Sequence, residues 1–131
     1  MSLTIAPEAH AAMLAAARAA HPREACGLLL GVGQRIHTAA AAANVHPRPL
    51  RHFEIDPAAL IAAHRAARAG GPQVLGYWHS HPNGRPEPSQ EDRALASGDG
   101  RAWAIVASGC ISVWRDGPEG FEALSYSVGD M

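Results

Sequence analysis

The chain contains 131 residues, of which 47% are hydrophobic but only 5% are aromatic, and its formal net charge at pH 7 is −1. A chain of this length is typical of one domain, so we expect a single domain over residues 1–131. The near-neutral charge argues against a nucleic-acid-binding surface and a polybasic membrane patch. The absence of lysine excludes a lysine Schiff base and a P-loop lysine.

Helices and strands are expected to mix along the chain, because alanine-rich and apolar stretches are separated by glycine and proline. Pro7 suits the first position of a helix, and Asp56 followed by Pro57 is a strong helix start. In chain order we expect a helix over 7–20, strands over 25–30 and 35–45, a loop over 46–51, a strand end at 53–55, a helix over 57–69, a strand over 74–79, an irregular loop over 82–88, a short helix over 89–96, and strands over 103–107, 110–114 and 121–125. This order predicts the α+β (mixed α/β) class, a central sheet flanked by two longer helices.

The two cysteines, Cys26 and Cys110, are too few for a disulfide framework, which favours a reduced cytoplasmic protein. Both lie in apolar segments, where a buried and inert thiol is expected. No stretch reaches the roughly 18 apolar residues that a membrane-spanning helix needs. Charged residues interrupt the alanine-rich N-terminal stretch, so we do not expect it to be a signal peptide.

Two histidines that are two residues apart mark the most informative stretch. His79 ends an expected strand and His81 follows two residues later; residues i and i+2 of a strand project from one face, about 7 Å apart. Two imidazoles placed in this way can bind one metal ion, with Asp92 of the following short helix as a third ligand. Two imidazoles and one carboxylate suit Zn²⁺, and three protein ligands leave one position for water, as in catalytic zinc sites.

A metal-assisted hydrolase also needs a proton carrier and a hydrogen-bond donor for the developing oxyanion. Glu24, just before an expected strand, is the candidate acid and base, and Ser89 is the candidate donor. Each residue alone also has a simpler interpretation. The histidine pair would suit a polar surface, Ser89 and Asp92 would suit an ordinary helix start, and Glu24 would suit a surface carboxylate.

The remaining candidates fall outside this constellation. Arg85 lies in the loop after the histidines and is expected to be solvated. Trp78 and Ser80 should point away from the face of the histidines, into packing. Six other histidines show no ligand spacing with the motif and are expected on surfaces or helix faces: His10, His21, His37, His46, His52 and His64.

The spacing of these residues resembles that of the JAMM (MPN+, Mov34/PAD-1-like) metalloproteases. The pattern of that family is an upstream glutamate, then His-x-His, seven residues, serine, two residues and aspartate. Here Glu24 is followed by His79-Ser80-His81, seven residues over 82–88, Ser89 and Asp92. The segments 24–31 and 53–57 are similar to the family as well, and the resemblance covers residues 3–126. The short length is similar to that of the stand-alone prokaryotic members.

This resemblance implies a curved mixed β-sheet between helices, with one zinc ion on His79, His81 and Asp92. It implies Glu24 as acid and base and Ser89 as the oxyanion partner. It also implies cleavage of an amide or isopeptide bond at the C-terminal tail of a ubiquitin-like protein. Bacterial relatives suggest a small sulfur-carrier protein of β-grasp fold with a Gly-Gly terminus as the partner. A polyubiquitin substrate, nucleic acid and membrane are not expected, and the oligomeric state is left open.

Three other functions are open at this point. A non-catalytic interaction module of the MPN type would typically have lost metal ligands, whereas all the motif residues are present here. A DNA-associated protein similar to the RadC family would carry a comparable His-x-His-Pro segment, but such chains usually have an additional N-terminal helical region and the neutral charge disfavours DNA. A cysteine hydrolase built on Cys26 would need an oriented base, and the sequence shows none.

Overall fold

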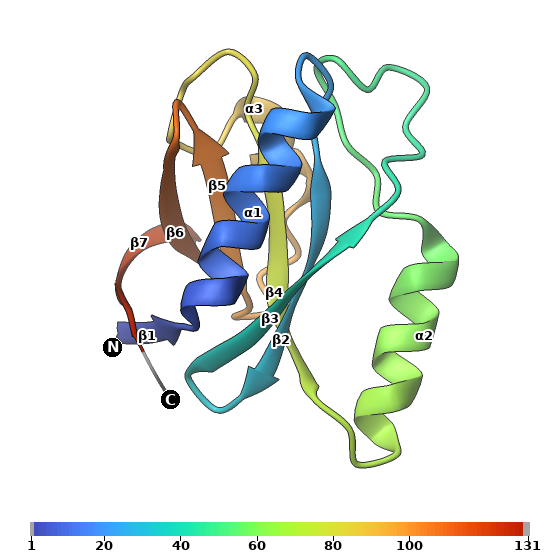
Figure 1. Ribbon diagram of the computed structural model, residues 1–131, viewed down its shortest axis with the longest axis vertical. Helices are drawn as coiled ribbons and strands as arrows, with labels where there is room; N and C mark the ends of the chain where they lie inside the picture. The colour runs from blue at the N-terminus through green and yellow to red at the C-terminus, as the bar shows by residue number, and fades with distance from the viewer. Residues whose placement is uncertain (1, 130–131) are drawn as a thin grey trace.

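The computed structural model describes residues 2–129, which form seven strands and three helices. The strands are β1 (Ser2–Ile5), β2 (Cys26–Val32), β3 (Arg35–Ala42), β4 (Gln73–Ser80), β5 (Ala102–Ala107), β6 (Cys110–Gly117) and β7 (Gly120–Val128). The helices are α1 (Pro7–Ala20), α2 (Pro57–Arg68) and α3 (Gln90–Leu95). Figure 1 shows α1 across one face of the sheet and α2 at the side of the molecule. The predicted α+β class is confirmed.

The sheet is mixed and closes on itself in the order β1-β3-β2-β4-β5-β6-β7. Neighbouring strands are antiparallel, except that β4 runs parallel to β5 and β1 runs parallel to both β3 and β7. The sequence predicted a curved mixed sheet but not its closure. The closing strand β1 has only four residues, which are too few for alternation to distinguish them from an irregular segment.

The two longer helices begin as predicted but contact the sheet differently. Helix α1 begins at Pro7, and its buried residues Ala9 and Met13 belong to the main hydrophobic core. Helix α2 has no fully buried residue, and the Asp56 carboxylate accepts a hydrogen bond from the N–H of Ala58 at 3.0 Å. Of the helices in residues 2–129, none combines the length and the apolar character that crossing a bilayer requires.

A glycine in β2 leaves room for the Trp78 side chain on one face of the sheet. A side chain at Gly27 would collide with the carbonyl of Ala40 and with the indole of Trp78. Without it, the Trp78 indole crosses β2 and its Nε1–H donates to the Ala40 carbonyl at 3.3 Å. Trp78 therefore packs into the core under α1, as predicted, while His79 points to the opposite face.

Two strand boundaries in the segment between β3 and α2 differ from the prediction. Strand β3 ends at Ala42 rather than at Val45, because the side chain of Asn44 accepts hydrogen bonds from the backbone N–H groups of His46 and Glu54. The expected strand end at 53–55 is reduced to one antiparallel bridge between Asn44 and Ile55. The chain between them therefore forms a loop whose two ends lie together.

Candidate metal centre

Three buried side chains converge on one point, and they are the predicted His79, His81 and Asp92. The Nε2 atom of His79 lies 3.0 Å from Asp92 Oδ1, and the Nε2 atom of His81 lies 3.0 Å from Asp92 Oδ2. The two Nε2 atoms are themselves 3.0 Å apart. Four ligands at zinc–ligand distances of about 2.0–2.1 Å in a tetrahedron lie about 3.3 Å from one another, so this triangle fits one ion.

The hydrogen bonds around His81 support a cation at this point. Its Nδ1 lies 2.8 Å from the carbonyl of Arg85, which can only accept, so Nδ1 carries a hydrogen. The Nε2 atom of a neutral His81 ring then presents a lone pair toward the Asp92 carboxylate. Two electron-pair donors facing each other need a proton or a cation between them. The donor set of two imidazoles and one carboxylate fits a divalent metal ion such as zinc.

The pKa values of Asp92, His79 and His81 are shifted by the burial of these side chains and by the contacts between them. Burial raises the pKa of Asp92, but the hydrogen bonds of His79 and His81 outweigh burial and hold that pKa well below its usual range. Burial lowers the pKa of His81, but the hydrogen bonds to Asp92 and to the Arg85 carbonyl, with the charges of Asp92 and Glu24, together outweigh burial, so the net pKa is raised. The fully buried His79 has a lowered pKa, chiefly because burial disfavours the charged ring. The charged carboxylate and the neutral His79 ring are the states that bind a metal ion, whereas His81 gives up its proton when a cation binds.

Strand β4 and its neighbours hold the histidine rings in place. The His79 ring stacks on Phe53 with centroids 4.2 Å apart, and Trp103 of β5 meets it edge-on at 5.8 Å. The backbone N–H of His81 donates to the carbonyl of Val106 at 2.8 Å. The Nδ1 atom of His79 has no hydrogen-bond partner among the described residues. Packing, rather than a hydrogen bond at Nδ1, therefore holds this side of the ring.

The N-terminal cap of helix α3 orients the Asp92 carboxylate. The hydroxyl oxygen of Ser89 accepts a hydrogen bond from the N–H of Asp92 at 3.0 Å, and Asp92 Oδ2 accepts one from the N–H of Ser89 at 2.9 Å. Asp92, one of the two residues that predicted the helix start, is thus also the predicted metal ligand. Because the Ser89 oxygen accepts in this cap, its O–H remains free to donate.

Glu24 lies beside this group, two residues before the beginning of β2. Cys26 pairs with His79, and the N–H of Ser80 donates to the carbonyl of Ala25, so Glu24 comes alongside His81. Its side chain is buried, and burial raises the pKa of Glu24 from 4.5 to about 7, although the charge of His81 acts in the opposite direction. The structure therefore brings all five motif residues to one place.

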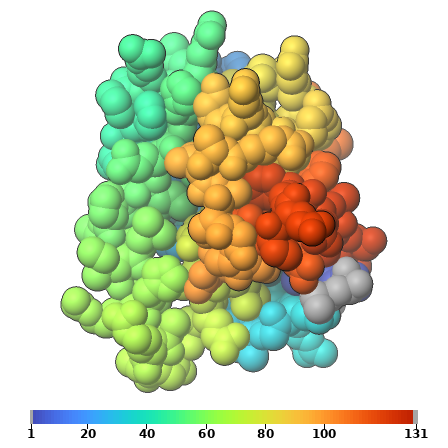
Figure 2. Space-filling view, turned by 180° about the vertical axis from the view of Figure 1, so that it is seen from behind, coloured from blue at the N-terminus to red at the C-terminus, as the bar shows by residue number. Residues whose placement is uncertain are grey.

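Two cavities meet at Glu24 and Ser89, which line both of them. The apolar cavity, of about 620 Å³, is lined chiefly by Phe53, Ile55, Leu60, Tyr77, Leu95 and Trp103. The polar cavity, of about 650 Å³, is lined chiefly by Arg51, His81, Arg85, Glu87, Gln90 and Glu91. Figure 2 shows the segments that border the apolar cavity side by side, the loop and α2 in green and α3 in orange.

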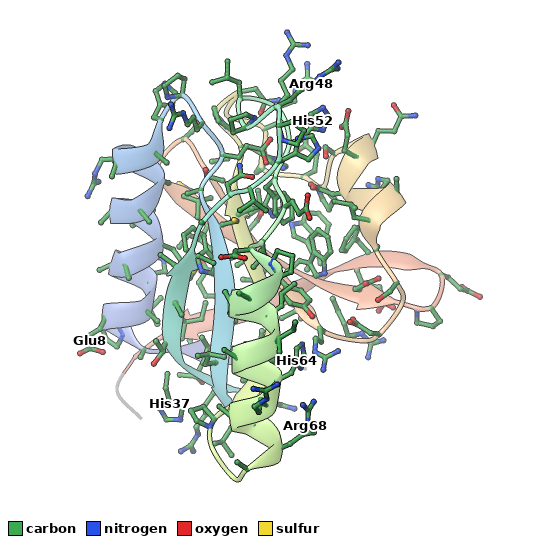
Figure 3. All side chains as sticks on the ribbon, turned by 90° about the vertical axis from the view of Figure 1, so that its right-hand side faces the viewer. Glu8, His37, Arg48, His52, His64 and Arg68 are labelled. Carbon is green, nitrogen blue, oxygen red and sulfur yellow. The ribbon has the colours of Figure 1, made fainter. Side chains whose placement is uncertain are left out.

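Arg85 and the histidines outside the motif lie where the sequence suggested, with two additions. Arg85 is exposed, but its carbonyl orients His81, which its side-chain chemistry could not reveal. His46 and His52 stack with centroids 4.7 Å apart and line the apolar cavity, although no ligand spacing marked them. Figure 3 shows His52 and Arg48 at one end of the molecule and His37 near the other.

The cysteines do not support a thiol nucleophile. Cys26 is buried, and burial raises the pKa of its thiol to about 11, so the reactive thiolate is scarce at neutral pH. The expected inert thiol is thus found at Cys26. Cys110 is exposed rather than buried, because it lies at the start of β6 directly after a tight turn.

Comparison with known proteins places the chain in a family. The model of the family described as prokaryotic homologues of the JAB domain matches residues 6–118. The desampylase of Haloferax volcanii is 33% identical over 133 residues, which cover 96% of each chain. A Thermus thermophilus protein, named as a probable TtuB-protein conjugate cleaving protease, is 38% identical over 71 residues, 54% of this chain and 47% of that protein.

Solved structures agree with this assignment. A protein from Desulfitobacterium hafniense superposes with a TM-score of 0.85 at 28% identity, covering 100% of this chain and 94% of the other. A JAB1/MPN domain protein from Archaeoglobus fulgidus has the same fold, with a TM-score of 0.69 at 23% identity and coverage of 98% and 100%. The chain therefore belongs to the prokaryotic JAB-domain family, and it is a hydrolase of the JAMM type, as its motif predicted.

Proposed function

We propose that this protein is a zinc-dependent peptidase or isopeptidase that hydrolyses an amide bond at the C-terminal tail of a ubiquitin-like or sulfur-carrier protein. The observation that carries the proposal is the convergence of His79, His81 and Asp92 beside the buried carboxylate of Glu24. The names of two relatives, a desampylase and a probable conjugate cleaving protease, support this substrate class. Two free cysteines support the proposed location in the reducing cytoplasm.

The metal ligands in this proposal are His79, His81 and Asp92. A zinc ion on these residues would supply a Lewis acid for the scissile carbonyl and lower the pKa of water toward about 7. The protein's part is to keep the His79 ring neutral, which its burial favours, and the Asp92 carboxylate charged, which the hydrogen bonds of the two histidines favour. Three protein ligands leave room for the reacting groups.

Glu24 carries the proton in this reaction. Its carboxylate takes a proton from water as the water oxygen bonds to the carbonyl carbon. It then gives that proton to the leaving nitrogen as the carbon–nitrogen bond breaks. A pKa of about 7 suits both steps, because both protonation states are populated near neutral pH. The products are a tail that ends in a carboxylate and a free amine.

Ser89 donates to the carbonyl oxygen as that oxygen gains negative charge. Its hydroxyl oxygen is already fixed by the N–H of Asp92, so the O–H direction is restricted before the substrate binds. The helix cap therefore keeps this donor close to the metal ligand, and little reorganisation accompanies the reaction.

The two cavities divide the substrate at the bond that breaks. The apolar cavity suits the extended tail, because Phe53, Tyr77 and Trp103 offer it an apolar wall. With the tail in the apolar cavity, the polar cavity is left for the amine side, and Glu24, which lines both cavities, can reach the leaving nitrogen. Two terminal glycines would let the carbonyl approach between Glu24 and Ser89 without a side chain in the way. The β-grasp carrier with a Gly-Gly tail is therefore our proposed partner.

The test uses the zinc-loaded protein and a β-grasp carrier whose terminal glycine is joined to a lysine side chain of a second protein. We expect mass spectrometry to show the free carrier with a carboxylate terminus. Glu24→Gln should retain one zinc ion and turn over about 10²–10⁴-fold more slowly. An intact conjugate after incubation with the loaded enzyme, or a fully active Glu24→Gln protein, would contradict the proposal.

A further inference from the structure

Asn44 uses its whole side-chain amide to join four backbone groups. Its Nδ2 donates to the carbonyl of Glu24 at 2.9 Å and to the carbonyl of His52 at 3.0 Å. Its Oδ1 accepts from the N–H of His46 at 3.1 Å and from the N–H of Glu54 at 3.0 Å. An asparagine amide has two donor hydrogens and two acceptor lone pairs, so every one of them is satisfied.

These partners require asparagine at this position. Two carbonyls face Nδ2 and two N–H groups face Oδ1, so the flipped amide would set like against like in all four contacts. Aspartate would keep the two bonds of Oδ1 but turn an acceptor toward both carbonyls. Alanine would leave all four backbone groups without this partner. The position therefore has a chemical requirement that packing alone would not impose.

The same loop holds the peptide of Glu24 from both sides. The carbonyl of Glu24 accepts from Asn44, and its N–H donates to the carbonyl of Pro49 at 2.7 Å. The ladder between β2 and β4 begins only at Cys26, two residues further on. Glu24 therefore stands beyond the end of the sheet, and the loop replaces the neighbouring strand as its support.

We propose that Asn44 is a positioning residue that fixes Glu24 for proton transfer by fastening the loop over 45–54 to the Glu24 peptide. The inference rests on the role of Glu24 in the proposed function. The loop also carries Phe53, which stacks on the His79 ring and lines the apolar cavity. One side chain thus links the proton carrier, the wall of the tail cavity and the support of a metal ligand.

The first experiment compares Asn44→Ala with the wild-type enzyme, both loaded with zinc. We expect kcat to fall by about 10- to 100-fold, the range expected for a misplacement of about 1 Å in a catalytic group. Zinc content should stay at one ion, because Asn44 touches none of His79, His81 and Asp92. An Asn44→Ala enzyme with wild-type kcat would overturn the proposal.

A double-mutant cycle separates positioning from general stabilisation. If Asn44 acts through Glu24, Asn44→Ala should reduce kcat strongly in the wild type but little in the Glu24→Gln background. Equal losses in both backgrounds would overturn the positioning role. If Glu24→Gln itself kept the wild-type rate, the proposed function would fail first, and the catalytic part of this inference would fail with it.

Hydrogen exchange of the metal-free protein gives a readout independent of activity. We expect the amides of Glu24, His46 and Glu54 to exchange faster in Asn44→Ala, while those of β5 and β6 keep the wild-type rate. Unchanged exchange at Glu24 would overturn the proposal, whatever the kinetics show.

A second variant covers the case in which Asn44→Ala does not fold. Asn44→Asp keeps the two bonds of Oδ1 and should show the same faster exchange at Glu24 and the same loss of kcat. Gln34→Glu adds the same charge at an exposed turn between β2 and β3, and its exchange and kcat should match the wild type. Equal behaviour of Asn44→Asp and Gln34→Glu would overturn the inference.

Discussion

Asp92 and Ser89 bind each other reciprocally, each through the other's backbone N–H, at 2.9 and 3.0 Å. The Asp92 carboxylate therefore caps α3 with one oxygen while both of its oxygens face histidine rings. A cap of this kind fixes the direction of the side chain before any ion binds. The preorganisation of the metal site thus begins with the start of a helix of six residues.

Replacing the serine should reveal both of its contributions. We expect Ser89→Ala to lower the free energy of unfolding by about 1 kcal/mol through the lost cap. Zinc affinity should fall about tenfold because Asp92 is less well oriented, and kcat should fall by about 10² because the oxyanion donor is gone. Ser89→Thr, which keeps the hydroxyl, is the control. Thermal unfolding and chelator competition measure the first two effects, and unchanged values would contradict the coupling.

Removal of one ligand side chain should weaken zinc binding more than it destabilises the fold. We expect His79→Ala and Asp92→Asn to lose bound zinc in the presence of an equimolar chelator, because two ligands hold the ion far less tightly than three. His64→Ala on α2 should bind zinc like the wild type, since this side chain takes no part in the ligand cluster. Mass spectrometry under native conditions counts the bound ions, and full occupancy of Asp92→Asn would speak against the assigned ligand set.

Zinc binding should weaken as the pH falls. A proton on His81 occupies the place that a cation would take, and the contact with Asp92 raises the pKa of that ring above its ordinary value of 6.5. Metal binding must therefore displace a proton at mildly acidic pH. Competition with a chromophoric chelator should give a dissociation constant that rises as the pH drops through this range. A constant that does not change with pH would show that His81 is not protonated in the free protein.

Glu24 should make the metal-free protein less stable at alkaline pH. Its pKa is about 7 when folded and 4.5 unfolded, so the folded state binds more protons between these values. The stabilisation is complete below pH 4.5 and is lost as the pH rises through 7, a difference of about 3 kcal/mol. Glu24→Gln should thus unfold at higher urea than the wild type near pH 8 but not near pH 4.5. Glu119→Gln, at an exposed turn, is the control, and identical pH profiles for all three proteins would refute the effect.

The buried carboxylate of Asp116 should stabilise the segment that follows α3. It is only 2% exposed and accepts hydrogen bonds from the N–H groups of Ser97 and Gly98, both at 3.0 Å. Asp116→Asn turns a donor toward one of these N–H groups, which should cost about 1–3 kcal/mol of unfolding free energy. Asp99→Asn changes the same charge on a more accessible side chain and should cost less. Chemical denaturation compares the two, and equal losses would argue against this role.

The motif could be predicted from the sequence because its signals are local. Alternation along β4 separates His79 and His81 from Trp78 and Ser80, and Ser80 indeed faces away, accepting from the N–H of Ala25 at 2.8 Å. The start of α3 likewise follows from Ser89, whose preference for caps is a property of its own side chain. The family pattern then linked Glu24 to these residues across the intervening chain.

What could not be predicted depends on partners that are distant in the sequence. Asn44 stands in an alanine-rich stretch, and its importance comes from carbonyls that only the fold brings to it. From the sequence, Asp116 is expected to be a surface aspartate near a turn. Only the fold shows that the loop after α3 covers it and donates to its carboxylate. No spacing pattern in the sequence marks either residue. Each binds backbone groups, and because every residue carries such groups, the partners leave no signal in the sequence.

The strand β1 has a consequence for how the chain reaches its native state. Ser2 pairs with Ser125, and Ile5 pairs with Val128, so the first strand can find this neighbour only after residues 125–128 have been made. Contacts between such distant segments carry a large entropic cost and form slowly. A chain during synthesis can assemble α1, β2 and β3 early, but its barrel stays open until β7 has formed, and the seam between β1 and β7 is where refolding should finish.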